Sequence, residues 1–406
     1  MHNFLAKLCD PRVKSALQRY LDWARGKDNT DDREIGDPDL FFAPVSINLD
    51  LTVACDYACD HCVDRGILNT GKRFDFDTLV ESLSLLRMAG LASVILIGGG
   101  EPTLYPKFQE CVVAIKALGL QCAVVSNGAH NERIAAVASV FQPGDWIRLS
   151  LDAATDATFQ RLHRPRRRIT LEEICVGAQA IKTRAPWVTL GFSFIVFWQE
   201  SGQRFEVVHS NVGEIAPAAR LAREVGFDYI SFKPNLARSE EGKEVINVGP
   251  PSSSPNGTVP QWPVSVVTEI RRKLHEAKQY ETKNFHVIPS LNLTDLLEPA
   301  RMSQAKQQPR RCHMQRFRQV LTPNGIFACP AYRGDRRSLL AYADGYASLE
   351  NLLQTARSSL RQVAQFDAAK ECREITCIYN RTNWRLEMGL EPGELCCDRQ
   401  IGDLFL

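Results

Sequence analysis

The sequence predicts an α/β protein: a partial (β/α)6 TIM-like barrel with a small C-terminal domain made of a hairpin and a helix. Between residues 46 and 232, strand-like and helix-like segments alternate with short links, an order that produces a parallel sheet with helices outside. Six such repeats suit an incomplete barrel. Near the C-terminus, an Asn-Gly pair at 324–325 stands between apolar runs, and this pattern favours a hairpin.

The first element is an N-terminal helical extension. Apolar side chains recur there at roughly helical spacing, ahead of a polar loop at 26–39; they are Leu5, Leu8, Val13, Leu17, Leu21 and Trp23. Such a segment can form a lid or substrate-recognition arm, or it can pack on the outside of the main domain. We favour the packed helix.

The barrel core comes next, and its loops should carry the chemistry. We expect strands at 46–53, 92–97, 121–125, 146–151, 187–197 and 228–232. We expect helices at 76–88, 105–118, 131–141, 171–183 and 212–225. In parallel barrels, functional residues lie in the loops at the carboxyl ends of the strands. The distinctive residues should therefore directly follow strands.

A Pro- and Ser-rich stretch at 250–257 separates the barrel from the rest of the chain, and we interpret it as a flexible or extended linker. Helices are expected after it at 264–279 and 349–366. The resulting division has four parts: a helical extension (1–43), the barrel core (44–233), a linker or flexible insertion (234–263) and a C-terminal region (264–406).

The composition is that of an ordinary globular protein. The chain has 406 residues, 24% charged, with a net charge of +2, so no global field indicates nucleic acid as a partner. No apolar run reaches the ~20 residues of a transmembrane helix, and we expect no membrane partner. The N-terminal apolar run is too short for a secretory signal. Thirteen cysteines without such a signal favour metal ligands in a reducing compartment, so we expect a cytoplasmic protein.

Three cysteines follow the first predicted strand at spacing C-x3-C-x2-C: Cys55, Cys59 and Cys62. Thiolates are the soft ligands that iron–sulfur clusters use, and a cubane normally takes four. A set of three would leave one iron open to a substrate or cofactor. Structural zinc, with His61 or a distant residue as fourth ligand, is one alternative. A redox dithiol at Cys59 and Cys62 is another.

Glycine-rich and polar segments follow the next predicted strands. The second strand leads into a glycine segment whose residues are Gly98, Gly99, Gly100, Glu101 and Pro102. Its spacing fits neither a P-loop nor a Rossmann fingerprint, but glycines let the backbone approach a ligand closely. The third strand leads to Ser126 and Asn127, and the fourth to Ser150 and Asp152.

From about Ile47 to Phe232, these motifs make the sequence resemble the radical S-adenosylmethionine (SAM) superfamily. The resemblance implies a 4Fe–4S cluster on the three cysteines, with its open iron chelated by the amino and carboxylate groups of SAM. It also implies that an electron from the cluster cleaves SAM to methionine and a 5′-deoxyadenosyl radical.

The same resemblance assigns cofactor contacts. The GGEP segment, residues 98–102, would hydrogen-bond the methionyl amino group of SAM. Ser126 (in the Ser-Asn127-Gly element), Ser150 and Asp152 are candidates for the ribose and carboxylate of SAM. His61 occupies a position that is usually aromatic and lies beside the adenine, and its flat ring can still stack.

A second set of cysteines lies near the C-terminus: Cys312, Cys329, Cys372 and Cys377. With the predicted hairpin and helix, it resembles the twitch domain, a shortened form of the SPASM domain. The resemblance implies a second, auxiliary 4Fe–4S cluster, although the last pair is four residues apart rather than two. A zinc site is the alternative. Of the adjacent Cys396 and Cys397, one could replace a cluster ligand or donate a hydrogen atom, as in radical SAM epimerases.

These features predict a radical SAM oxidoreductase or epimerase. It would abstract hydrogen from a C–H bond of a small polar metabolite (a sugar, cyclitol or nucleoside), with dehydrogenation or epimerisation as the outcome. A flavodoxin- or ferredoxin-type protein is the expected electron donor. A maturase that cross-links or epimerises a ribosomally made peptide is the runner-up, and a zinc-stabilised binding protein is the alternative from another class.

Overall fold

The computed structural model describes residues 3–25, 42–198, 210–247, 262–389 and 402–406. One ten-stranded sheet organises these residues, in the order β12-β11-β10-β1-β2-β3-β4-β5-β6-β9. Its strands are β1 (Ser46–Leu49), β2 (Ser93–Leu96), β3 (Gln121–Ser126), β4 (Trp146–Ser150), β5 (Thr189–Val196), β6 (Tyr229–Pro234), β9 (His286–Pro289), β10 (Arg318–Thr322), β11 (Gly325–Phe327) and β12 (Leu339–Ala341).

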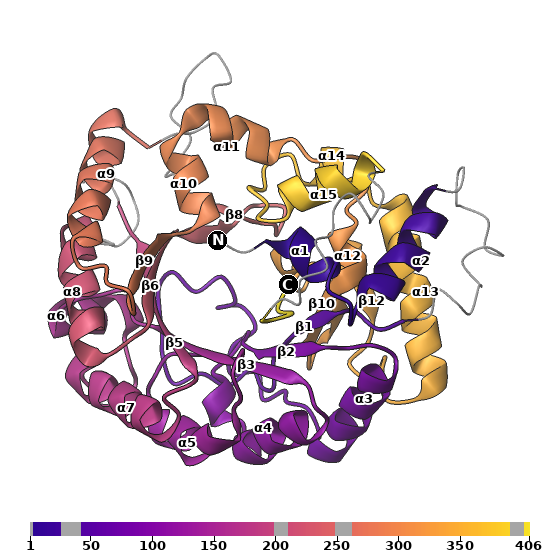
Figure 1. Cartoon of the computed structure of the whole chain (residues 1–406), viewed down its shortest axis with the longest axis horizontal. Helices are drawn as coiled ribbons and strands as arrows, with labels where there is room; N and C mark the ends of the chain where they lie inside the picture. The colour runs from indigo at the N-terminus through magenta and orange to yellow at the C-terminus, as the bar shows by residue number, and fades with distance from the viewer. Residues whose placement is uncertain (1–2, 26–41, 199–209, 248–261, 390–401) are drawn as a thin grey trace.

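The sheet is parallel from β10 to β9 and antiparallel only at β11 and β12. It curves into an arc whose ends do not meet in the described part of the chain (Figure 1). The predicted α/β class and partial barrel are therefore confirmed. All six predicted barrel strands form, whereas β9 was not predicted and adds a further parallel strand beside β6.

Helices cover the convex face of the arc (Figure 1). The barrel helices are α3 (Phe76–Met88), α4 (Phe108–Ala117), α5 (Asn131–Ala136), α6 (Asp156–His163), α7 (Leu171–Arg184) and α8 (Ile215–Val225). Leu49, Val124 and Phe192 are fully buried in the core between sheet and helices. Because successive strand residues point to opposite faces, their neighbours Asn48 and Ser193 lie on the concave face.

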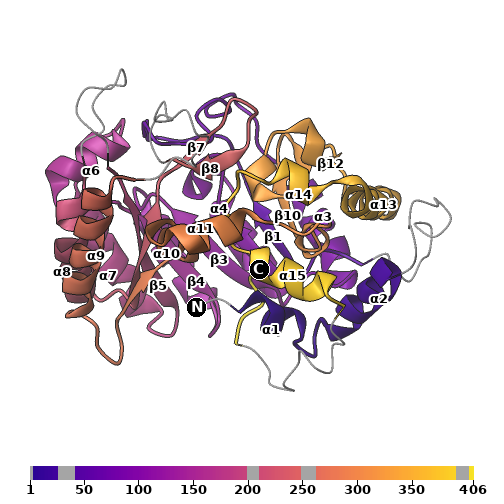
Figure 2. The same ribbon diagram turned by 90° about the horizontal axis from the view of Figure 1, so that it is seen from above.

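The N-terminal extension packs against C-terminal elements rather than over the barrel mouth. Helices α1 (Phe4–Leu8) and α2 (Lys14–Arg25) share an apolar cluster with Phe317, Tyr379 and Leu386. Residues 402–406 join the same region (Figure 2), and Lys7 forms an ion pair with Asp403. The structure thus bears out the outside-packed helix that the apolar spacing favoured.

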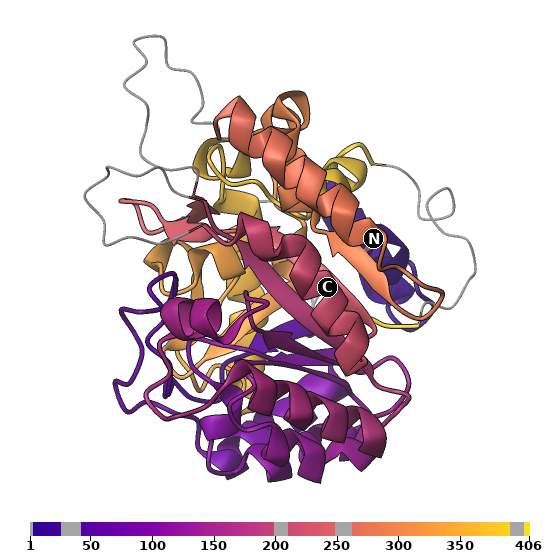
Figure 3. The same cartoon turned by 90° about the vertical axis from the view of Figure 1, so that its left-hand side faces the viewer.

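The chain between β6 and β9 forms a hairpin and a helix. Strands β7 (Leu236–Arg238) and β8 (Glu244–Ile246) pair antiparallel within the expected linker, whose central part, 248–261, lies outside the described residues. Helix α9 (Val264–Lys278) follows and packs beside α8 (Figure 3). None of the described helices combines the length and apolarity needed to cross a bilayer.

The C-terminal hairpin extends the barrel sheet. Strand β10 lies parallel to β1, with Arg318 beside Ser46, and turns back into β11. The register pairs Thr322 with Gly325, so the turn residues are Pro323 and Asn324, one position earlier than the Asn-Gly pair predicted. The Thr322 hydroxyl accepts a hydrogen bond from the Asn324 N–H at 3.0 Å, which stabilises the shifted turn.

The remaining helices complete the C-terminal region at the open side of the arc. They are α10 (Leu291–Leu297), α11 (Pro299–Lys306), α12 (Met314–Phe317), α13 (Leu349–Gln365), α14 (Ala368–Glu371) and α15 (Asn380–Glu387). Helix α13 is the long amphipathic helix that the sequence predicted after the hairpin.

Candidate metal and cofactor site

The first cysteine loop follows β1 and is anchored at several points. The Cys55 N–H donates to the Asn69 side chain at 2.9 Å, and the Ala58 N–H donates to the carbonyl of His163 at 3.2 Å. Burial raises the pKa of all three thiols, to about 12 at Cys55. A metal that binds here must displace these protons.

The spacing of the sulfur atoms separates two kinds of metal site. Among the described residues, the potential metal-ligand atoms of Cys59, His61 and His163 all lie within 4.8 Å of one another. The three cysteine sulfurs do not form such a group. A tetrahedral zinc ion with Zn–S bonds of ~2.3 Å holds its sulfurs roughly 3.8 Å apart, whereas a cluster distributes its thiolates over several irons. The wider spacing fits a cluster better than a single zinc ion.

The glycine segment after β2 lies directly against the cysteine loop. A Cβ on Gly100 would stand 2.4 Å from the carbonyl oxygen of Thr52 and 2.7 Å from that of Ala54. Both oxygens belong to backbone that leads into Cys55, so no side chain can give way. The Gly99 N–H donates to the Asp50 carboxylate at 3.0 Å. The fold therefore brings the two main sequence motifs into backbone contact.

Glu101 joins the second and third strand ends. Its buried carboxylate accepts hydrogen bonds from Thr103 N–H and hydroxyl, from the Ser126 hydroxyl at 2.8 Å and from the Asn127 N–H at 2.8 Å. Burial raises its pKa, and these donors oppose the rise. The carboxylate is thus satisfied within the protein, and it positions the loops around it.

Asp152 follows β4 and faces two histidines. Its backbone has a positive φ of 55°, a conformation that Asp tolerates better than most residues. One carboxylate oxygen accepts from the Ile195 N–H at 2.6 Å, and the other lies 3.5 Å from His61 Nε2 and 3.4 Å from His163 Nε2. Burial alone would raise the pKa of Asp152, but the two histidines hold it below its usual value.

His163, near the end of α6, is a further residue of this site. Its Nε2 lies 3.0 Å from the Leu151 carbonyl, and its Nδ1 lies 3.4 Å from the Cys59 sulfur. Burial lowers its pKa to about 4 against the opposing pull of Asp152, so the ring is neutral near pH 7. In the sequence, His163 is a single histidine before Arg164 and Pro165, and no other potential ligand stands at a spacing that would mark it as a site residue.

The expected site residues of the barrel gather at the carboxyl ends of β1 to β4. The loop cysteines, the glycine segment and Asp152 are linked through the contacts above, and Ser150 stands half-exposed on the concave side of β4. His61 packs its ring 4.7 Å from that of Phe197. Within the part of the chain that the structure describes, these three soft donors have no fourth thiol beside them, and with the glycine cradle they fit a three-cysteine 4Fe–4S cluster that binds a further ligand.

The second cysteine set also comes together. Cys312, Cys329, Cys372 and Cys377 all pack against one small apolar cluster that contains Tyr332 and Phe366. Burial raises the pKa of each thiol, to about 12 at Cys329. Four partly buried thiols from the hairpin, the segment before α12 and the chain after α13 converge on one place, and four thiols are the number that a fully ligated cluster takes.

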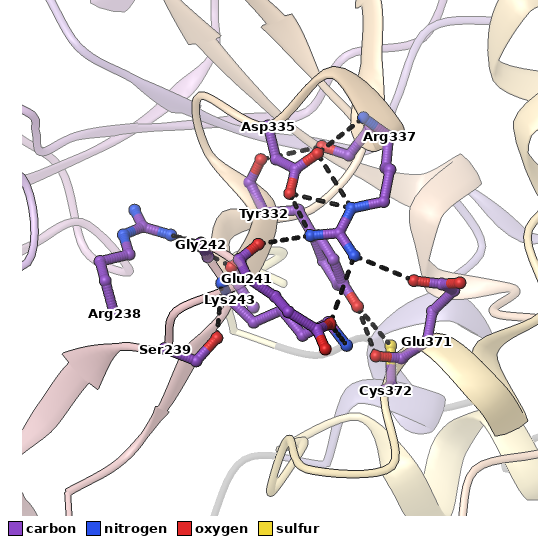
Figure 4. Close-up of polar contacts among 12 residues, drawn as sticks. Arg238, Ser239, Glu241, Gly242, Lys243, Tyr332, Asp335, Arg337, Glu371 and Cys372 are labelled. Atoms are coloured by element: carbon purple, nitrogen blue, oxygen red, sulfur yellow. Dashed lines mark hydrogen bonds and ion pairs between the residues drawn. The ribbon is translucent and has the colours of Figure 1, made fainter.

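A polar network holds this second set against the β7–β8 hairpin (Figure 4). The Tyr332 hydroxyl donates to the Glu371 carbonyl at 2.6 Å and lies 3.9 Å from the Cys372 sulfur. The Arg337 guanidinium covers the Tyr332 ring at 5.2 Å and pairs with Asp335 and Glu371. The network fixes the chain around Cys372.

Two expected site residues cannot be placed. Cys396 and Cys397 lie outside the described residues. Cys9 is disulfide-bonded, whereas the other described cysteines are free thiols.

Residues 49–196 match the family model of the Radical SAM superfamily. An S-adenosylmethionine-dependent nucleotide dehydratase from Thermoplasmatales archaeon (strain ISO4-H5) is 33% identical over 114 residues, 28% of this chain and 39% of that protein. The mycofactocin maturase MftC of Mycobacterium ulcerans (strain Agy99) is 32% identical over 120 residues, 28% of this chain and 30% of that protein. The chain thus aligns with well under half the length of these curated relatives.

Solved structures share the fold at low sequence identity. Streptococcus suis SuiB superposes with a TM-score of 0.53 at 12% identity, over 77% of this chain and 66% of that chain. The structure of anSMEcpe with bound AdoMet and Cp18Cys peptide has a TM-score of 0.53 at 11% identity, over 87% of this chain and 98% of that one.

Proposed function

We propose that this chain, which carries a radical SAM domain across residues 49–196, abstracts a hydrogen atom from a C–H bond of a small polar metabolite. The 4Fe–4S cluster and SAM expected from the sequence are the cofactors of the family whose model residues 49–196 match. When bound, they supply a 5′-deoxyadenosyl radical after one-electron reduction of SAM. The match to this family supports an enzyme, and its oxidoreductase or epimerase type is part of our proposal.

The observation that carries the proposal is the backbone contact between the cysteine loop and the glycine segment. Gly100 lies against the carbonyls of Thr52 and Ala54, so the peptide groups of residues 98–100 border the three thiols. We assign Cys55, Cys59 and Cys62 to the cluster, and residues 98–102 to the amino group of SAM. Ser150 and Asp152 are assigned to its ribose or carboxylate. Glu101, Ser126 and Asn127 hold these loops in place through their mutual hydrogen bonds.

The second cysteine set supports an oxidative outcome. We assign Cys312, Cys329, Cys372 and Cys377 to an auxiliary 4Fe–4S cluster. A cluster on these four cysteines would supply an acceptor for the electron that a substrate radical gives up together with a proton, and one SAM would be consumed per turnover. Epimerisation instead requires a thiol that returns a hydrogen atom, for which Cys396 and Cys397 are the candidates. A flavodoxin- or ferredoxin-type protein is the proposed source of the reducing electron.

Two substrate classes are supported by different relatives. The archaeal relative is named as a nucleotide dehydratase, which favours a small metabolite. MftC is named as a maturase, and SuiB has been solved bound to its precursor peptide, with a TM-score of 0.50. These names favour a peptide as the second candidate. The polar concave face of β4 to β6, described below, inclines us to the small metabolite.

The class of chemistry can be tested without knowing the substrate. Anaerobically purified and reconstituted protein should be brown, and with dithionite it should convert SAM to 5′-deoxyadenosine and methionine, measured by liquid chromatography and mass spectrometry. Cys59→Ala should abolish both products, whereas Cys175→Ala, which removes a buried free thiol in α7, should retain them. A colourless wild-type protein containing zinc and forming no 5′-deoxyadenosine would contradict the proposal.

A further inference from the structure

The concave face of β4, β5 and β6 carries three rows of polar side chains, which we call the polar ladder. In the first row, the strand register places Arg148 beside Gly191 and Gly191 beside Tyr229. Two residues further along each strand, the second row aligns Ser150, Ser193 and Ser231. In the third row, Lys233 of β6 lies beside Ile195 of β5. The members are Arg148, Tyr229, Ser150, Ser193, Ser231 and Lys233. The alternate residues of these strands, such as Leu149 and Phe192, form the core beneath the helices.

Arg148 is held in place from two sides. Its guanidinium lies 5.4 Å from the centre of the Trp146 ring. On the neighbouring strand β5, a Cβ on Gly191 would lie 2.2 Å from the Tyr229 ring. The Tyr229 ring therefore occupies the space that a side chain at position 191 would fill. Burial raises the pKa of Tyr229 and Arg148 opposes the rise, so the phenol and the guanidinium lie close together.

The cations of this face have no carboxylate partner. Among the described residues, neither Arg148 nor Lys233 forms an ion pair, and Arg318, which enters from β10, forms none either; its guanidinium donates to the Asn48 side chain at 2.9 Å. The Nε atoms of Arg148 and Arg318 are buried without a hydrogen-bond partner. Uncompensated cations at buried positions are costly and are normally matched by an anion.

These three charges act on one another and lie between the two cysteine sets. Burial lowers the pKa of Lys233, as does Arg148, while Asp152 raises it. Burial lowers the pKa of Arg318 to about 10; Cys329 opposes this shift, and Arg148 adds to it. Glu244 also interacts with Arg318, but forms no ion pair with it among the described residues. Lys233 is thus near Asp152 of the first site, and Arg318 is near Cys329 of the second cysteine set.

We propose that the polar ladder, together with Arg318, binds a phosphate group, so that the substrate is a phosphorylated small metabolite. A phosphate monoester carries about −1.5 to −2 charges and three acceptor oxygens, which match the three cations and the hydroxyls of Ser193, Ser231 and Tyr229 better than a carboxylate does. Arginine forks suit phosphate geometry. This inference deepens the proposed function and rests on it, since the phosphate would place the rest of the substrate between the two cysteine sets.

Binding of inorganic pyrophosphate to the cluster-loaded, SAM-saturated protein tests the proposal by anaerobic titration calorimetry. We expect Arg148→Gln and Lys233→Met each to raise the pyrophosphate Kd at least tenfold, whereas Lys233→Arg, which keeps the charge, should stay within about threefold. Arg220→Gln removes an exposed cation on α8 and should have no effect. Thermal melting of each variant verifies that it is folded.

Three outcomes would overturn the inference: equal pyrophosphate affinity in wild type and both charge-removing variants, succinate binding as tightly as pyrophosphate, or a loss of SAM affinity that matches the loss of pyrophosphate affinity. The last would assign these cations to the cofactor carboxylate. Failure of the proposed function is read separately, as the absence of 5′-deoxyadenosine from the wild-type protein, and does not depend on pyrophosphate.

Discussion

The carboxylate of Glu101 accepts a hydrogen bond from the backbone N–H of Asn127 at 2.8 Å. This contact ties the glycine segment after β2 to the loop after β3. Because the carboxylate is buried and takes three further hydrogen bonds from Thr103 and Ser126, its charge is used to order the site. Two loops whose bonded residues, Glu101 and Asn127, are 26 positions apart in the chain are thereby held as one unit.

Replacing Glu101 by Gln should loosen this unit. The amide NH2 of Gln would face donors, leaving at least one of them unsatisfied at a cost of about 1–3 kcal/mol. We expect a lower melting temperature and at least a tenfold weaker SAM affinity, measured by anaerobic titration. Glu110→Gln, on the surface of α4, is the matched control. Unchanged SAM affinity in Glu101→Gln would show that the loops hold their geometry without the carboxylate.

A methyl group at Gly100 should disrupt the contact between the two motifs. The new Cβ would lie 2.4 Å from a backbone carbonyl, so the cysteine loop or the glycine segment must shift. Gly100→Ala should reduce cluster incorporation, measured as iron per protein, to below half of the wild-type value. Gly66→Ala is the control, because nothing lies within 4 Å of its Cβ position. Equal iron content in both variants would contradict the close approach.

Removing one ligand from the second cysteine set should leave the first cluster intact. In Cys372→Ala, iron should fall from about eight to about four atoms per chain if each set holds one cubane. The electron paramagnetic resonance signal that responds to SAM should persist, since our proposal assigns the open iron to the cluster held by Cys55, Cys59 and Cys62. A loss of all iron would instead indicate that the second set stabilises the whole fold.

The pH dependence of the free energy of unfolding should reveal the raised pKa of the buried Asp50 carboxyl. Burial raises the pKa of this carboxyl from 3.8 to about 6, although Arg333 lies 3.4 Å away and opposes the rise. A raised pKa means that folding favours the protonated form, so this contribution to stability is complete below pH ~4 and is lost as the pH rises through about 6.

Asp50→Asn stays neutral at every pH and should avoid this loss. Between pH 4.5 and 7.5, the variant should gain on wild type by about 2 kcal/mol, because about 1.5 pKa units of the shift lie within this window. Urea unfolding at both pH values measures the difference. The exposed Asp22→Asn on α2 should show no comparable trend, and parallel pH curves for wild type and Asp50→Asn would refute the buried-acid account.

Local sequence patterns were sufficient for the elements that are continuous in the chain. The six barrel strands and helices such as α3 and α7 follow apolar periodicity, which reports the buried face of one element at a time. The cysteine triplet and the glycine segment were recognisable because the spacing of their chemistry is local. Their meeting could be expected from the rule that parallel strands end at one edge.

Pairing between distant segments was beyond those patterns. Strand β9 is short and half-exposed, and nothing in its sequence shows that it lies beside β6. The turn of the C-terminal hairpin lies one residue earlier than predicted, where the Asn324 N–H donates to the Thr322 hydroxyl, although Asn-Gly is the stronger local signal. In a strand, such a shift decides which side chains face the core.

The sequence by itself determined the kind of chemistry: thiol donors, glycine approach and an alternating β/α chain are properties of neighbouring residues. Only the tertiary structure decided what surrounds that chemistry. It placed His163 beside Cys59, and it grouped Arg148, Lys233 and Arg318 without acidic partners among the described residues. The physical reason is that charge balance and burial depend on side chains from separate strands, whose distances are set only when the sheet forms and curves.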